Sequence, residues 1–312
     1  MTGTITDAHA HADGTDPMPS VTILDGGLST ALEQQGIAVD GALWTARLLA
    51  DEPERIAQAH RDFFEAGADV ATTATYQASE QGFLAAGFEA AHARALIRRG
   101  VRLARDARDE LESVRPGLRV AASVGPYGAV LGDGSEYRGG YGISAARLRD
   151  FHRARLELLA EAGPDLFAVE TIPDVEEADV LVGLLDEIGI PAWFSYSVRG
   201  TATCAGQPLA DAYAALADSS VLIAAGVNCS DQADVRAAIS TSVQVTGLPG
   251  VVYPNRGGHW DSATKAWSGV HAVDHALIEG WMDAGARYIG GCCGYGPADI
   301  AGLAKAVASV LR

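Results

Sequence analysis

Three cysteines in two short motifs have residue types and positions that suit a metal site. Cys292 and Cys293 are adjacent in GGCCGYG, and Cys229 ends GVNC. Zinc binds thiolates at about 2.3 Å in a tetrahedron, so its sulfur ligands lie about 3.8 Å apart. Three thiolates leave a fourth position open, which is the arrangement of a catalytic zinc rather than a structural one. The cysteines therefore indicate a candidate metal centre that could bind and activate a substrate.

Two other interpretations of these cysteines stay open at this point. Cysteine is often buried as a small apolar residue, and no CxxC pair supports metal binding here. A disulfide between the adjacent Cys292 and Cys293 is a minor alternative that would be strained. The fourth cysteine, Cys204 in TATCAGQPL, lies in an expected loop and is interpreted as a bystander.

Eight short apolar runs alternate with longer amphipathic stretches and supply the elements that would position these residues. Such runs are typical of strands buried on both faces, as parallel strands are. The runs cover residues 21–27, 68–76, 119–128, 166–172, 192–198, 221–229, 250–255 and 288–294.

Helical patterns occupy the segments between the runs. Residues 89–111 carry one apolar stripe, and residues 174–189 open with acidic side chains that suit a helix N-terminus. The last helix is expected to begin at Pro297. The glycines of EAGAD, EAGPD and DAGAR are expected to end helices just before strands.

This alternation predicts a single α/β domain, a (β/α)8 barrel of the TIM type that covers residues 21–312. A doubly wound open sheet is the alternative. It should carry a glycine-rich phosphate loop after an early strand, and DGGLST does not match GxGxxG. Residues 1–20 are expected to form a flexible N-terminal leader.

Polar side chains cluster where the expected strands end, which is where barrels of this kind carry their active sites. Asp25, Tyr76, Tyr127, Glu170 and Asn228 all occupy such positions. Asp25 stands before two glycines and could merely cap the next helix. Glu170 lies inside an apolar strand, where a buried carboxylate needs a partner.

The adjacent cysteines place a condition on the eighth strand. Neighbouring side chains on a flat strand point to opposite faces. Cys292 and Cys293 could therefore share one ion only if the strand bends, which Gly290, Gly291 and Gly294 would allow.

Composition limits the partners and the compartment. The net charge is −17, with 40 acidic and 23 basic residues, which argues against nucleic acids and anionic membrane surfaces as partners. The sequence contains no run of 18 or more apolar residues, so no transmembrane helix is predicted. The first residues also lack the pattern of a signal peptide. Four cysteines in an unexported chain favour a reducing cytoplasm. The residues do not indicate an oligomeric state.

A second candidate metal motif lies at the N-terminus. Asp7, His9 and His11 in TDAHAHAD resemble the HxH motif that follows the first barrel strand of amidohydrolases. The preceding MTGTIT is a poor strand, and a better first strand follows at residues 21–27. Weak metal binding or disorder is therefore preferred over a hydrolase site.

Six motifs in order resemble one known family. With DGGLSTALEQQG, SVGPYGAVLGDGSEYRG, VETIPDVEEA, GVNCS, VVYPNRG and IGGCCG, the chain resembles the homocysteine S-methyltransferases from about residue 20 to its C-terminus. It is most similar to the branch that uses S-methylmethionine or S-adenosylmethionine as methyl donor.

The resemblance implies a zinc-dependent enzyme that makes methionine. It implies one Zn²⁺ per chain on Cys229, Cys292 and Cys293, with the homocysteine sulfur in the open position. It also implies that Asp25 and Glu170 hold the amino group of the substrate. Asn228 is a further candidate for substrate binding. The chain departs from many relatives after GGCC, where two threonines are replaced by Tyr295 and Gly296.

The chemistry of the residues suits methyl transfer independently of the resemblance. A metal deprotonates a bound thiol, so no general base is required. A thiolate that attacks a sulfonium methyl group cancels two charges, which a dry site favours. Aromatic rings could bind the sulfonium through cation–π contacts, unless they only pack the barrel top. The candidates are Trp44, Tyr76, Tyr127 and Tyr141.

The preferred hypothesis is therefore a cytoplasmic zinc-dependent homocysteine S-methyltransferase with a sulfonium donor. Related methyltransferases that use another thiol or selenol acceptor, or a betaine-type donor, are alternatives. A metal-dependent hydrolase that uses the N-terminal HxH motif is another. A non-catalytic barrel that binds an amino acid or senses thiols is the third.

Overall fold

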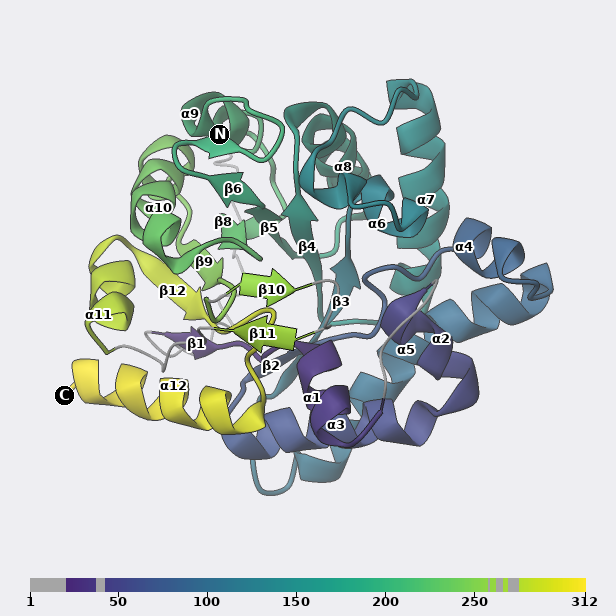
Figure 1. The fold of residues 1–312 in the computed structure, drawn as a ribbon, viewed down its shortest axis with the longest axis horizontal. Helices are drawn as coiled ribbons and strands as arrows, with labels where there is room; N and C mark the ends of the chain where they lie inside the picture. The colour runs from purple at the N-terminus through teal and green to yellow at the C-terminus, as the bar shows by residue number, and fades with distance from the viewer. Residues whose placement is uncertain (1–20, 38–42, 258, 262–265, 269–274) are drawn as a thin grey trace, which may run out of the picture.

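The structure is a computed structural model that describes residues 21–37, 43–257, 259–261, 266–268 and 275–312. In these ranges the chain forms an eight-stranded parallel sheet that curls into a barrel inside a ring of helices (Figure 1). None of the helices in this part of the chain is long and apolar enough to cross a membrane.

The sheet runs in the order β1-β12-β9-β8-β5-β4-β3-β2, and each neighbouring pair is parallel. A bridge between Leu24 and Val70 links the two edge strands β1 and β2. The strands are β1 Thr22–Ile23, β2 Val70–Thr72, β3 Arg119–Val124, β4 Leu166–Ile172, β5 Ala192–Tyr196, β8 Leu222–Asn228, β9 Gly250–Tyr253 and β12 Ala286–Ile289. The predicted (β/α)8 barrel is confirmed, and the open-sheet alternative is wrong.

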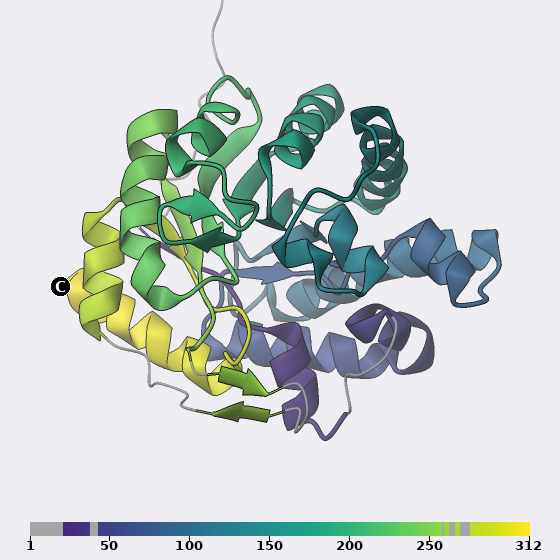
Figure 2. The same cartoon turned by 45° about the horizontal axis from the view of Figure 1, so that its top comes forward.

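The helices surround the sheet, and two short hairpins extend its loops. The hairpins pair β6 Val198–Arg199 with β7 Ala202–Thr203, and β10 His259–Asp261 with β11 Ala266–Ser268. Figure 2 shows the second hairpin beside α1. The helices are α1 Leu28–Gln34, α2 Trp44–Asp51, α3 Pro53–Ala66, α4 Glu80–Ala85, α5 Ala90–Leu111, α6 Tyr127–Leu131, η1 (3-10) Ser135–Tyr137, α7 Ala145–Glu161, α8 Val175–Ile188, α9 Leu209–Ala214, α10 Gln232–Thr246, α11 His275–Asp283 and α12 Pro297–Val310.

The helix boundaries follow from the local sequence. Gly67 and Gly285, in EAGAD and DAGAR, have φ values of 114° and 104° and allow the chain to leave α3 and α11 for the next strand. Asp174 caps α8 by accepting a hydrogen bond from the backbone N–H of Glu177 at 2.9 Å. The predicted helices at residues 89–111 and 174–189, and the predicted start at Pro297, are confirmed.

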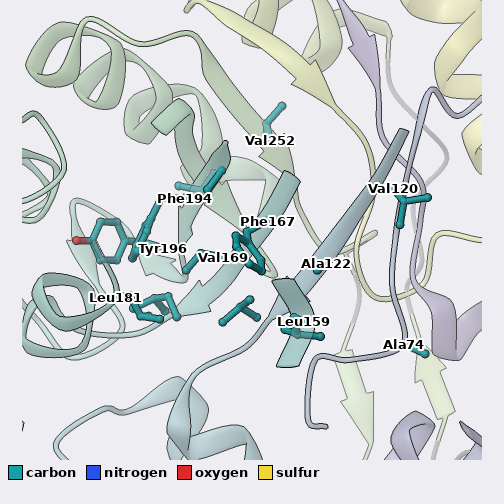
Figure 3. Close-up of a cluster of buried hydrophobic side chains, with 14 of the residues drawn as sticks. Ala74, Val120, Ala122, Leu159, Phe167, Val169, Leu181, Phe194, Tyr196 and Val252 are labelled. Carbon is teal, nitrogen blue, oxygen red and sulfur yellow. The ribbon is translucent and has the colours of Figure 1, made fainter. Parts of the chain in front are cut away.

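Two hydrophobic layers hold the barrel. Inside it, Trp193 lies with smaller side chains and donates a hydrogen bond from Nε1 to the Tyr253 hydroxyl at 2.9 Å. Between the strands and the outer helices, Phe167 and Phe194 pack with the helix residues Leu159 and Leu181 (Figure 3). Full burial of each such side chain stabilises the folded state by about 1.5–3 kcal/mol. The packing also fixes the strand ends that carry the polar residues.

The eighth strand is shorter than predicted. The expected range was 288–294, but β12 ends at Ile289, so Cys292 and Cys293 lie in the loop after the strand and not in it. The reason is the glycine pair Gly290 and Gly291, which lies between Ile289 and the cysteines. A Cβ on Gly290 would lie 2.6 Å from Leu24 Cβ, and a Cβ on Gly291 would overlap the Tyr295 ring. These glycines permit close packing of a turn rather than the bend of a strand.

Candidate metal centre and substrate cavity

The three predicted cysteines lie together at the barrel end where β8 and β12 finish. Their sulfurs lie within 4.8 Å of one another. Cys293 Sγ is 3.9 Å from Cys229 Sγ and 4.0 Å from Cys292 Sγ. These separations match the roughly 3.8 Å of thiolates around a tetrahedral zinc and exclude a disulfide, whose sulfurs are about 2 Å apart. The cluster therefore fits a metal ion that prefers sulfur ligands.

The backbone around the cluster is held by neighbouring loops. Cys229 has a φ of 47°, a conformation that residues other than glycine rarely adopt and that often marks functional sites. Its N–H donates to the Tyr253 carbonyl at 3.1 Å, and the Cys292 N–H donates to the Pro254 carbonyl at 2.9 Å. Both cysteine segments are thereby anchored to the end of β9, which lies between β8 and β12 in the sheet.

The sulfurs strongly influence one another's protonation. Hydrogen bonds from Cys292 and Cys293 lower the pKa of the Cys229 thiol, and hydrogen bonds from Tyr137 and Asn255 add to this effect. The same bonds to Cys229 raise the pKa of Cys292 and of Cys293. Three thiolates this close repel one another, so a bound divalent cation is what would allow all three to ionise together.

A cavity of about 120 Å³ lies against the sulfurs. It contains two of the predicted substrate residues, Tyr76 and Glu170, together with the three cysteines. The lining residues are Gly26, Gly27, Leu28, Ser29, Thr72, Thr73, Ala74, Tyr76, Ser123, Tyr137, Glu170, Thr171, Cys229, Tyr253, Gly291, Cys292 and Cys293.

Glu170 presents a carboxylate to this cavity from the middle of a strand whose seven residues are all buried. Ser123 Oγ and the Tyr253 hydroxyl donate hydrogen bonds to it. Burial raises the pKa of Glu170 to about 7 despite these bonds, and the nearby charge of Cys229 adds to the rise. Neither of its two hydroxyl partners carries a positive charge, so the carboxylate can accept a cationic ligand.

Asp25 lies beside this wall of the cavity but is not part of its lining. Its Oδ2 accepts a hydrogen bond from the Thr72 N–H at 2.7 Å, and its Oδ1 accepts one from Thr72 Oγ1 at 2.6 Å. Burial raises the pKa of Asp25 to about 8, and the charge of Glu170 contributes. The capping interpretation is wrong, because α1 begins after Gly27 with no side-chain cap.

Asn228 is fully buried and holds the residue next to Glu170. Its Oδ1 accepts the Thr171 N–H at 2.6 Å, and its Nδ2 donates to Thr171 Oγ1 at 2.8 Å. Thr171 has a φ of 62°, which is costly for a β-branched residue. The amide of Asn228 therefore fixes a strained strand end, and its predicted contact with substrate stays a prediction.

Replacing Asn228 with alanine should lower the free energy of unfolding by about 2–4 kcal/mol, because two hydrogen bonds are lost and a buried N–H is left unpaired. Urea denaturation measures this loss. Thr171→Val is the matched control, since it breaks only the bond from Asn228 Nδ2 and keeps the Thr171 N–H paired, so it should cost less, about 1–2 kcal/mol. A smaller loss for Asn228→Ala than for Thr171→Val would contradict this role.

The predicted aromatic residues separate into two groups. Tyr76 lines the cavity. Tyr127 and Tyr141 pack against each other, and the Tyr141 hydroxyl and the Tyr127 backbone N–H donate hydrogen bonds to Glu177. These contacts support barrel-top packing rather than ligand contact. Trp44 begins α2, but its side chain lies outside the part of the chain that the structure describes.

Residues that sequence reasoning missed complete the site. The Tyr137 hydroxyl lies 3.2 Å from Cys229 Sγ, and Ser123 and Tyr253 hold Glu170. Tyr137 belongs to the DGSEYRG motif, so the motif contained a signal for it. Asp7, His9 and His11 lie outside the described residues.

Tyr295, in the loop after the adjacent cysteines, points into the protein. It is 2% exposed, its ring packs against Gly291, and its hydroxyl accepts a hydrogen bond from Gln232 Nε2 at 2.9 Å. Gly296 precedes α12 and donates its N–H to Asp299 at 2.9 Å. Tyr295 therefore supports the cysteine turn from behind and does not line the cavity.

Comparison with known proteins adds a second line of evidence. The sequence model described as homocysteine S-methyltransferase matches residues 22–307. The chain belongs to this family. Homocysteine S-methyltransferase of Escherichia coli strain K12 is 44% identical over 91% of this chain and 94% of its own. Selenocysteine Se-methyltransferase of Brassica oleracea is 39% identical over 92% of this chain and 89% of its own.

Solved structures agree with the family assignment. The metallated form of the homocysteine methyltransferase MmuM from Escherichia coli superposes with a TM-score of 0.83 at 41% identity, covering 92% of this chain and 96% of that one. As a member of the homocysteine S-methyltransferase family, the chain is a methyltransferase enzyme whose family acts on homocysteine.

Proposed function

We propose that this homocysteine S-methyltransferase is zinc-dependent and takes its methyl group from a sulfonium donor, S-methylmethionine or S-adenosylmethionine. The acceptor would be the thiol of homocysteine, and the product methionine. The observation that carries the proposal is the placement of three cysteine sulfurs in one cavity with the buried carboxylate of Glu170. The existence of a metallated form of the Escherichia coli enzyme MmuM supports a role for a metal.

Cys229, Cys292 and Cys293 would hold the zinc ion. When bound there, zinc would keep the acceptor sulfur in its thiolate form, so that no protein base is needed. The chain itself offers the three thiolates from two anchored turns, and Tyr137 donates a hydrogen bond that stabilises the negative charge on Cys229. The cytoplasm suits this site, because a reducing compartment keeps the thiols free.

Glu170 would bind the ammonium group of homocysteine, with Asp25 adding negative charge from behind Thr72. Ser123 and Tyr253 orient the Glu170 carboxylate, and Asn228 fixes the adjacent Thr171. Tyr76 offers an aromatic face to the cationic donor. Methyl transfer cancels the charges of sulfonium and thiolate, so a buried cavity that excludes water favours it. The main remaining task of the protein is to hold the acceptor sulfur in line with the methyl carbon and the donor sulfur.

A selenol acceptor is a second candidate, because one relative is named a selenocysteine Se-methyltransferase. The two acceptors can be compared directly in one assay. Purified enzyme would be given homocysteine or selenocysteine with each sulfonium donor in parallel. A higher kcat/KM for homocysteine supports the first proposal, and a higher value for selenocysteine supports the second.

The proposed function is tested by metal analysis together with methionine formation. We expect about one zinc per chain and methionine from homocysteine with at least one sulfonium donor. Methyl transfer that persists in a metal-free enzyme would contradict the zinc proposal. Homocysteine binding with no transfer from any sulfonium would favour the non-catalytic barrel, and full activity after deletion of residues 1–18 would exclude the HxH hydrolase.

Binding of an amino-acid ligand should release protons near pH 7. The pKa values of about 7 for Glu170 and about 8 for Asp25 mean that both carboxyl groups are at least partly protonated there. An ammonium group favours their ionised forms, so affinity should fall as pH drops through about 8 and then about 7. Calorimetry with methionine in buffers of different ionisation enthalpy counts the protons, because methionine has no thiol to titrate.

The matched control for proton release is Glu170→Gln. This variant keeps the side-chain shape and removes one titrating group, so fewer protons should leave on methionine binding. Equal release in both proteins would exclude Glu170 as the source. No release in the unmodified enzyme would contradict an ammonium site at these carboxylates.

A further inference from the structure

Glu136 is a buried carboxylate that the proposed roles do not use. It lies in η1 between Ser135 and Tyr137 and is 7% exposed. Within the described ranges its Oε2 atom is buried and has no hydrogen-bond partner. The carboxylate accepts a hydrogen bond from its own backbone N–H, but a buried oxygen without a partner still costs free energy unless a ligand completes it. The position therefore needs an explanation.

Glu136 is not part of the cavity lining, but it adjoins a residue that is. The next residue, Tyr137, lines the cavity and contacts Cys229 Sγ. Burial raises the pKa of Glu136, and the charges of Asp133 and Cys229 raise it further. The charge of Glu136 in turn contributes to the raised pKa of Tyr76, whose main cause is burial. Glu136 therefore acts electrostatically on two cavity-lining residues.

The nearby arginine does not neutralise Glu136 through an ion pair. Arg138 lies on the exposed side of the same loop, and its guanidinium is 3.8 Å from Asp133 Oδ2. Both of those side chains are well exposed, so solvent screens their charges. Asp133 also accepts the Ser135 N–H at 2.9 Å and shapes the turn. Glu136 is the inward-lying carboxylate of this loop, and Asp133 is the outward one.

We propose that Glu136 is a specificity-determining residue that recognises the positive charge of the sulfonium methyl donor. This inference rests on the proposed use of a sulfonium. Asp25 and Glu170 are assigned to the ammonium group of the acceptor, which leaves Glu136 as the carboxylate near Cys229, Tyr76 and Tyr137 for the second cation. The loop that contacts the metal-site cysteine would thus also carry the group that selects the donor.

The reaction makes this charge useful for distinguishing donor from product. The acceptor sulfur forms a bond to the methyl carbon, and the bond from that carbon to the donor sulfur breaks. The electron pair of the broken bond stays on the donor sulfur, which becomes a neutral thioether. Glu136 would therefore attract the donor and lose its partner after transfer. Because the sulfonium charge is fading in the transition state, Glu136 should act on donor binding rather than on kcat.

The test compares Glu136→Gln with unmodified enzyme, using S-methylmethionine as donor. We expect the donor KM to rise about 10- to 100-fold, the range for loss of a charged contact. The KM for homocysteine should not change, and kcat should not fall. Methionine differs from S-methylmethionine by one methyl group and its charge, so its inhibition constant against the donor should not change either.

Two further variants control this experiment. Asp133→Asn removes the same charge from the same loop at an exposed position, and its donor KM should stay unchanged. Glu136→Asp keeps the charge and should raise the donor KM less than Glu136→Gln. If the glutamine variant does not fold, the aspartate variant still tests the contact, because it should raise the donor KM without changing kcat or the homocysteine KM.

The outcomes separate this inference from the function on which it rests. An unmodified enzyme that transfers methyl from no sulfonium overturns the proposed function. An unmodified enzyme that uses S-methylmethionine, with an unchanged donor KM in Glu136→Gln, overturns only the role of Glu136. Equal rises in donor KM for Glu136→Gln and Asp133→Asn would also overturn it, because they would indicate a general charge effect.

Discussion

Replacing Cys229 with serine should abolish metal binding and methyl transfer together. Serine keeps the shape of the side chain, but its hydroxyl does not ionise near neutral pH and is a poor ligand for a metal that prefers sulfur. We expect kcat/KM to fall at least about 1,000-fold, which corresponds to about 4 kcal/mol of transition-state stabilisation. Metal analysis and methionine formation measure the two losses on the same sample.

Cys204→Ser is the matched control for this prediction. Cys204 follows β7 and is a free, partly buried thiol outside the three-cysteine cluster. The Cys204→Ser enzyme should keep its metal and full activity. This result would separate a local effect at the cluster from a general effect of losing a thiol. A Cys229→Ser enzyme that retains one metal per chain and normal turnover would rule out the cluster as the reacting centre.

The sequence contained enough information to predict the barrel and the cysteine cluster. Parallel strands are buried on both faces, so apolar runs such as LFAVETI are visible without any structure. A charged residue within such a run, Glu170, stands out because burial without a partner is costly. Cys229 and Cys292 could be placed at one end of the barrel because the strand ends of a parallel barrel share one rim.

Local backbone geometry could not be predicted in the same way. The residue type of Thr171 favours an extended strand, yet Asn228 holds it at a φ of 62° through contacts 57 residues away in sequence. The end of β12 depends on Leu24 and Tyr295, which crowd the space beside Gly290 and Gly291. Such features depend on tertiary packing, which periodicity and propensity do not encode.

The loop residues were missed for a related reason. Tyr137 and Glu136 lie in a 3-10 turn with no repeating pattern, and only the tertiary fold brings the Tyr137 hydroxyl to Cys229 across the barrel end. Tyr295 is the converse case. The sequence singled it out as a departure from the family pattern, but its place is set by packing, because the ring is buried behind the cysteine turn.

Glu170→Gln should have the second large effect, a loss of about 100- to 1,000-fold in kcat/KM for homocysteine. Truncating one partner of a buried charge pair costs about 2–5 kcal/mol, because the remaining ammonium is left uncompensated. Asp25→Asn should cost less, since Asp25 does not line the cavity and its main partner is Thr72. Steady-state kinetics with saturating donor measures both losses.

The acceptor 4-mercaptobutanoate decides whether this loss concerns the amino group. It keeps the thiol and the carboxylate of homocysteine but has no ammonium group. If Glu170 binds the ammonium, unmodified enzyme and Glu170→Gln should use this acceptor with similar kcat/KM. An equally large loss with both acceptors would instead mean that Glu170 supports the cavity through Ser123 and Tyr253. The amino-group role therefore depends on a difference between two acceptors, which a purely structural carboxylate would not produce.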